Sequence, residues 1–195
     1  MATRSDRRID RLLVTLTPRE RALLVLRAWK EGREPAAHLL HSRSDGEAFE
    51  YNRILDLLRV ASEELTQYLV VIHLLVGQLQ MKLCWYLTIL LWGLAHDDER
   101  AEELRVLVLK GLTDGIAQRW RELGALEVAL AEIADEVDGE DVLHPAARSC
   151  LVETREQLHE LHDEVTTRGG DCELGDPSDE DVEAVRALIK KATRS

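Results

Sequence analysis

Apolar residues in the middle of the chain recur with the spacing of a helix that packs lengthwise against another helix. From residue 44 or 45 to about residue 95, no proline and no cluster of turn residues interrupts the sequence. Steps of four and three residues keep one apolar seam facing a partner helix. The positions with this spacing are Ile54, Leu58, Ala61, Leu65, Tyr68, Ile72, Leu75, Leu79 and Leu83. The segment therefore predicts one very long helix, or two nearly continuous ones, with coiled-coil-like packing.

A second apolar stripe predicts the other arm of a helical hairpin. The acidic residues 97–99 favour the start of a helix, because negative charge is stabilising at a helix N-terminus. The stripe continues to about Val137 through Leu104, Val108, Leu112, Ile116, Trp120, Leu123, Leu130 and Ile133. We expect two antiparallel helices joined at residues 96–98. Gly111 and Gly115 each cost about 1 kcal/mol relative to alanine inside a helix, so a kink or break is expected there.

Shorter helices are predicted on both sides of this hairpin. Thr17 can cap a helix whose first position is Pro18, and Glu20 completes a capping box. A further helix is expected over residues 145–167. After a glycine-rich loop, a last helix should run from the cap Ser178 to about residue 192.

The composition supports an all-α protein. Hydrophobic residues make up 45% of the 195 residues and charged residues 32%, whereas aromatic residues, which strands prefer, are only 4%. We predict a single all-α domain, a helical bundle built on the long antiparallel hairpin with flanking N-terminal and C-terminal helices. Residues 1–43 form a basic N-terminal helix and connector, residues 44–137 the hairpin, and residues 138–195 the C-terminal helices.

The charge argues against a nucleic-acid-binding protein. The formal net charge is -12, whereas binding to phosphates depends on clustered Lys and Arg. The excess of basic residues before residue 34 is the exception, and this arm could dock on acidic partners or on a second copy of the chain.

Cysteine content and the N-terminal sequence indicate a cytoplasmic protein. Cys84, Cys150 and Cys172 are too few and too scattered for a disulfide framework, which favours a reducing compartment. No apolar segment with a small-residue cleavage site follows the first residues, so no secretory signal is expected.

The apolar stretch over residues 68–95 also has to be considered as a membrane span. Its longest clean run is about 13 residues, whereas about 20 are needed to cross a bilayer. His73, Gln78, Gln80 and Lys82 stand near its middle, where an ionised side chain costs about 3 kcal/mol. We therefore expect a core helix, or one buried in an oligomer interface, in place of a membrane span.

The length of the apolar helix favours self-association. It offers more apolar surface than three short helices can cover, and a dimer or higher assembly buries such surface. The residues expected to carry the contact are Leu65, Ile72, Leu79, Leu83 and Trp92. The function predicted from the sequence is that of a non-enzymatic interaction or assembly protein, a homo-oligomer that could also bind another protein.

A polar stripe runs along the same helix, apart from its apolar seam. It includes Thr66, His73, Gln80, Cys84 and Thr88. These side chains could line a pocket inside a bundle. They could equally be buried groups whose hydrogen bonds are satisfied in close helix packing.

A group of His and acidic residues near the C-terminus supports a different function. Glu156, His159, His162 and Asp163 lie close together on one predicted helix. The spacing of Glu156 and His159 resembles the Glu-x-x-His pairs of di-iron carboxylate bundles, but the chain has no second such pair. The alternative is thus a bundle that binds a divalent metal or a small ligand through these residues and His73, and that could be an enzyme. A solvated helix face would show the same residues, and no catalytic set is specific enough to predict an activity.

Overall fold

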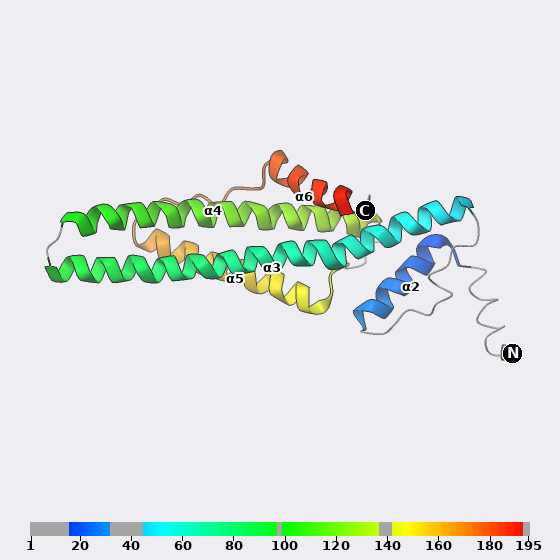
Figure 1. Cartoon of the computed structure of the whole chain (residues 1–195), viewed down its shortest axis with the longest axis horizontal. Helices are drawn as coiled ribbons and strands as arrows, with labels where there is room; N and C mark the ends of the chain where they lie inside the picture. The colour runs from blue at the N-terminus through cyan, green and yellow to red at the C-terminus, as the bar shows by residue number, and fades with distance from the viewer. Residues whose placement is uncertain (1–15, 32–44, 97–98, 137–141, 193–195) are drawn as a thin grey trace. The chain divides into compact units, whose positions relative to one another are not determined.

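The computed structural model describes residues 16–31, 45–96, 99–136 and 142–192. These residues form five helices and no strands, which confirms the predicted all-α bundle. The helices are α2 (Pro18–Lys30), α3 (Asp45–His96), α4 (Glu99–Glu136), α5 (Pro145–Thr167) and α6 (Asp179–Ala192) (Figure 1). Most of the predicted basic N-terminal segment and its connector lies outside the described residues.

The chain divides into two compact units. One unit consists of residues 1–65, 130–145 and 188–195, and the other of residues 66–129 and 146–187. Both long helices and α6 contribute to each unit, so the unit boundaries differ from the three segments expected from the sequence. The single domain stays a prediction.

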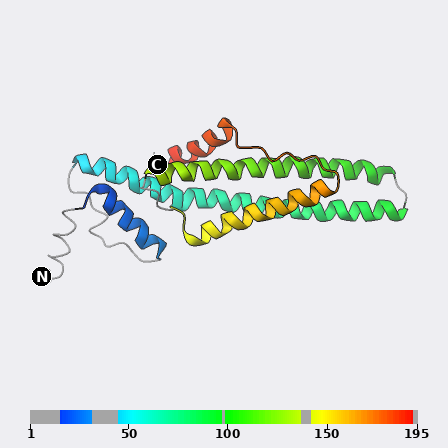
Figure 2. The same ribbon diagram turned by 180° about the vertical axis from the view of Figure 1, so that it is seen from behind.

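In the second unit, α3 and α4 run side by side, as the two opposite views agree (Figures 1 and 2). Along the whole of α3, which contributes residues to both units, the buried side chains form one seam, which we call the inner seam: Leu58, Ala61, Leu65, Leu69, Ile72, Val76, Leu79 and Tyr86. Its spacing confirms a coiled-coil-like pattern, but beyond Leu65 it passes through Leu69 and Val76 in place of Tyr68 and Leu75, which are only half-buried. The buried face of α3 shifts toward Leu69 and Val76 because α5 packs against that side of the helix. His73 Nδ1 on α3 lies 2.9 Å from Thr154 Oγ1 on α5.

The predicted interruption of the second long helix is not found. Helix α4 continues through Gly111 and Gly115. At Gly115 a Cβ atom would lie 2.6 Å from Leu79 Cδ2, and at Gly93 it would lie 2.7 Å from the Cβ of Ala101. Glycine therefore lets the two long helices approach closely at these levels, which compensates for its low helix propensity.

Two of the predicted helix starts are confirmed by capping geometry. The backbone N–H of Glu20 donates to Thr17 Oγ1 at 3.2 Å, and the N–H of Thr17 donates to Glu20 Oε2 at 2.8 Å. Ser178 and Asp181 form the same box at the start of α6, with distances of 3.2 and 2.9 Å. Both carboxyl groups accept hydrogen bonds from their cap residue, which lowers their pKa.

Helix α5 has the predicted bounds and ends in a glycine motif. Gly169 has a φ of 81°, and the N–H of Gly170 donates to the carbonyl of Val165 at 3.0 Å. The N–H of Gly169 donates to the carbonyl of Thr166 at 3.0 Å. This is the Schellman arrangement, in which glycine adopts the left-handed conformation that terminates a helix.

Candidate functional site

Most of the residues predicted to carry an intermolecular contact lie inside the chain's own core. Leu65 and Ile72 are fully buried, Leu79 is 5% exposed, and Leu83 is half-buried. Leu65, Ile72 and Leu79 are therefore buried within a single chain, and Leu79 lies against α4 at Gly115. Trp92, which is 48% exposed, is the member of the predicted set that remains accessible.

The accessible apolar residues form a second seam on the opposite side of α3. Leu74, Met81, Trp85 and Trp92 are exposed to between 48% and 63%. Each residue turns the helix by about 100° about its axis, so these four side chains point within about 40° of one another around α3. They point roughly 200° away from Ile72 around the same axis. Gln78 and Thr88 lie between these residues on the same face of the helix. Together with one residue at each end, they give eight positions spaced three and four residues apart, and all eight are exposed. We call them the outer seam: Val71, Leu74, Gln78, Met81, Trp85, Thr88, Trp92 and Ala95.

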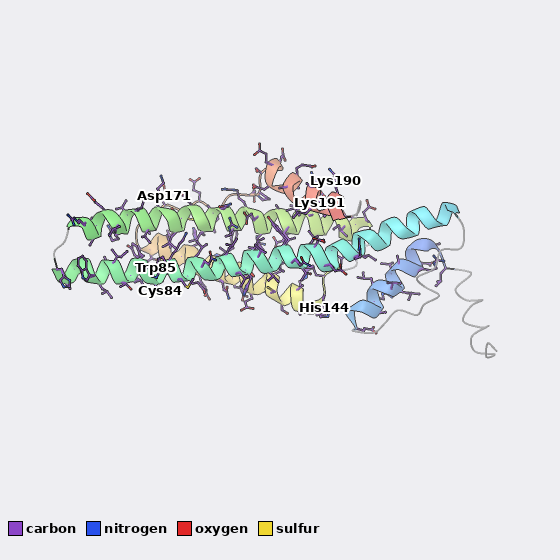
Figure 3. The ribbon with its side chains drawn as sticks, viewed as in Figure 1. Cys84, Trp85, His144, Asp171, Lys190 and Lys191 are labelled. Atoms are coloured by element: carbon purple, nitrogen blue, oxygen red, sulfur yellow. The ribbon has the colours of Figure 1, made fainter. Side chains whose placement is uncertain are left out.

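The outer seam is free because the neighbouring helices occupy the other sides of α3. Helix α4 packs near Gly93 and Tyr86, whose hydroxyl accepts a hydrogen bond from Arg105 at 3.1 Å. Helix α5 packs on the side of His73. Figure 3 labels Cys84 and Trp85 on the same stretch of α3. The helix thus presents one covered face and one uncovered face along more than 20 residues.

Apolar exposure extends around the end of the hairpin. Leu91 and Leu94 of α3 are 67% and 76% exposed, and Leu104 and Leu107 of α4 are 50% and 67% exposed. Residues 63–96 form a helical segment that is long and apolar enough, by length and composition alone, to cross a membrane. Within its most apolar stretch of 18 residues, 17% is buried.

The residues of the predicted polar stripe have different surroundings. His73 contacts Thr154, which is fully buried and donates its own proton to the carbonyl of Cys150 at 2.6 Å. Because the hydroxyl proton of Thr154 is used in this way, its oxygen accepts from His73 Nδ1. This pair is a satisfied hydrogen bond between α3 and α5, as the packing interpretation expects.

The other members of the polar stripe divide between the interior and the surface. Gln80, Cys84 and Thr88 are exposed, and the Thr88 hydroxyl donates to the carbonyl of Cys84 at 2.9 Å. Thr66 is half-buried, and its hydroxyl oxygen is buried.

Among the His and acidic residues of α5, both histidines contact Asp163, and His162 also contacts the loop after the helix. His162 Nε2 is 3.1 Å from the carbonyl oxygen of Cys172, and its Nδ1 is 3.2 Å from Asp163 Oδ1. His159 is 60% exposed, with Nδ1 at 3.3 Å from Asp163 Oδ2, and Glu156 is exposed. Both ring nitrogens of His162 therefore face oxygen atoms of the chain, and within the described ranges no three His, Cys, Asp or Glu side chains are grouped to hold a metal ion.

Cys172 is a neutral thiol in this arrangement. Its Sγ donates to the carbonyl of Thr113 at 3.5 Å, and burial raises its pKa. A thiol of raised pKa is a poor nucleophile and a poor metal ligand at neutral pH. The contact joins the loop after α5 to α4.

Sequence reasoning missed a polar contact between α4 and α5. Arg155 donates to Glu127 Oε1 at 2.7 Å, and its guanidinium carbon lies 4.8 Å from the centre of a Trp120 ring. The rings of Trp120 and His159 also meet in a T-shaped arrangement, with ring centres 6.4 Å apart. The half-exposed Arg155 and Glu127 link α4 and α5, and no spacing rule within one helix could have paired them.

No protein-family model, no curated protein and no solved structure matches this chain.

Proposed function

We propose that this chain is a non-enzymatic helical assembly protein that self-associates through the outer seam of α3. The observation that carries the proposal is the row of exposed large side chains Leu74, Met81, Trp85 and Trp92 on one face of one helix. Single exposed apolar residues are common on proteins, but a contiguous patch of more than a few hundred Å² is rare on a soluble monomer. Contact with a second copy removes this surface from water.

A second copy fits this face better than an acidic or basic partner does. The outer seam carries no charged residue, and its two polar members are neutral. A two-fold contact uses the same patch on both subunits, which requires only that the patch is complementary to itself. We place this assembly in the cytoplasm, where the three free cysteines stay reduced.

Insertion of α3 into a membrane is less favourable than this assembly. Helix α4 packs against α3 at Gly93 and at Tyr86, so α3 would have to leave these contacts or carry α4 with it. The ion pair of Glu102 and Arg105 would then enter the apolar layer. Each ionised group costs about 3 kcal/mol even on permissive insertion scales.

The proposal is tested by measuring the molar mass of the full chain in detergent-free buffer, by light scattering after size-exclusion chromatography. We expect a mass of at least a dimer for the unchanged protein. Trp85→Glu places a charge in the seam and should weaken self-association by at least about 30-fold, the effect of losing a strong interface residue.

Val152→Glu is the matched control. Val152 is 50% exposed on α5, so the change is equally apolar-to-acidic but lies outside the seam. Its mass should equal that of the unchanged protein. A monomeric unchanged protein, or equal loss of assembly in both variants, would rule out self-association through this face.

A further inference from the structure

The two seams of α3 have the same spacing but different occupants. The inner seam is buried, and α4 and α5 contact α3 at Leu79 and His73, whereas every position of the outer seam is exposed. Steps of three and four residues are the spacing that lets side chains of one helix fit between those of a facing helix. The outer seam therefore has the spacing that would let it pack against a second helix.

The outer seam is symmetric about the level of Leu83. Met81 and Trp85 are equally distant in sequence from Leu83, on opposite sides of it. The same is true of Gln78 and Thr88, and then of Leu74 and Trp92. Each step outward pairs two apolar residues or two polar ones. From this we infer that two copies pair their α3 helices antiparallel, about a two-fold axis at the level of Leu83. The inference rests on the proposed self-association and adds its geometry.

The two polar positions select this register. In the antiparallel pair, Gln78 faces Thr88 of the partner subunit. The Thr88 hydroxyl already donates to the carbonyl of Cys84, so its oxygen can accept the Gln78 amide of the partner subunit. A shift by one heptad would set Gln78 against Met81 or Ala95 of the partner subunit, and a buried polar group without a partner is costly. Polar residues at seam positions fix register in the same way in coiled coils.

The tryptophans favour the antiparallel direction. Antiparallel pairing sets Trp85 against Met81 and Trp92 against Leu74 of the partner subunit, so each layer combines one large and one smaller side chain. Parallel pairing would place each tryptophan against its own copy and leave the layers of Leu74 and Met81 underfilled. Interiors are close-packed, and uneven layers lose contacts.

The surface is large enough for a stable dimer. A large side chain offers up to about 200 Å², so five of them at roughly half exposure supply on the order of 500 Å² per chain. Gln78, Thr88, Ala95 and the stems of flanking residues such as Lys82 add to this. The total approaches the roughly 800 Å² per partner of a standard interface.

The register is tested with cysteines at the paired polar positions. In a full-length chain with its three native cysteines changed to alanine, Gln78→Cys and Thr88→Cys are introduced singly and together, and a mild oxidant is added. Ten residues separate the two sites, a rise of about 15 Å along one helix, which a disulfide within one chain cannot bridge. We expect the double variant to form a covalent dimer through two disulfides, and neither single variant to do so.

The outcomes separate the inference from the proposed function. A covalent dimer of Gln78→Cys alone would mean parallel pairing, and an assembly whose double variant stays uncross-linked would mean another register. Both results overturn the inference while self-association stands. A detergent-free monomer that sediments with vesicles of phosphatidylcholine and phosphatidylglycerol would overturn both, with the membrane as the occupant of the seam. Circular dichroism of each variant shows that the helices are intact.

Discussion

The close approach of α3 and α4 at Gly115 gives a quantitative test of the core. In Gly115→Ala, the new methyl group would lie 2.6 Å from Leu79 Cδ2 and 3.7 Å from Leu79 Cγ. Alanine gains about 1 kcal/mol of helix propensity over glycine, whereas overpacking a buried site costs about 1–3 kcal/mol. We expect a net loss of up to about 2 kcal/mol in the free energy of unfolding.

Gly111→Ala is the matched control for this change. Gly111 lies one turn earlier on the same helix, and a Cβ atom there would meet no atom within 4 Å. Only the propensity term acts, so this variant should be stabilised by up to about 1 kcal/mol. The difference between the two variants isolates the packing term.

The double variant Leu79→Ala/Gly115→Ala completes the test. Leu79→Ala alone should cost about 2–5 kcal/mol, because Leu79 is buried and a cavity remains. The alanine methyl at residue 115 then partly fills that cavity, so the double variant should be about 1–3 kcal/mol more stable than the sum of the single changes.

The assay is urea unfolding followed by circular dichroism at one fixed protein concentration, because self-association makes stability depend on concentration. Equal effects at residues 111 and 115, together with additivity within about 0.5 kcal/mol, would refute the close contact of the two helices.

Three further predictions concern the caps and the polar contacts. Ser178→Ala should destabilise the protein by about 1 kcal/mol in urea unfolding at neutral pH. The cap lowers the pKa of Asp181 in the folded protein below its ordinary 3.8, so the stability that the cap contributes is present above that value and is lost as the pH falls through the folded pKa. The difference in stability between Ser178→Ala and the unchanged protein should therefore shrink in acid. A difference that stays constant with pH would contradict the capping role. Thr154→Val removes the hydroxyl that accepts the hydrogen bond of His73 and should lower the free energy of unfolding by about 1–3 kcal/mol, measured by thermal unfolding. The control Thr166→Val makes the same change on the exposed side of α5 and should lower it by less than about 0.5 kcal/mol. Elemental analysis of the purified protein should find no stoichiometric transition metal, since both nitrogens of His162 face oxygen atoms of the chain; bound metal that His159→Ala removes would restore the metal-binding alternative.

Local patterns were sufficient to predict the five helices within the described part of the chain. The capping boxes at Thr17 and Ser178 and the proline at residue 145 mark helix starts through contacts within a few residues, so the sequence alone locates them. The hairpin was predicted because the seam of α3 has a period that only a helix in lengthwise contact uses. The predicted break in α4 failed because propensity counts only the cost of Gly115, whereas the benefit comes from Leu79 on another helix.

The sequence could not predict which apolar face of α3 is buried and which is exposed. Helix α3 is apolar on several sides, so Ile72 and Leu79 could not be told apart from Leu74 and Trp85 as core or surface. Only the packing of α4 and α5 made that choice, and it moved the candidate contact from the predicted inner residues to the outer seam. Likewise, His73 finds Thr154 and Arg155 finds Glu127 across helices. The sequence by itself determined where the helices begin and that they pack lengthwise, because those signals are local and periodic; the tertiary structure decided which apolar face remains open, because burial depends on neighbours distant in the chain.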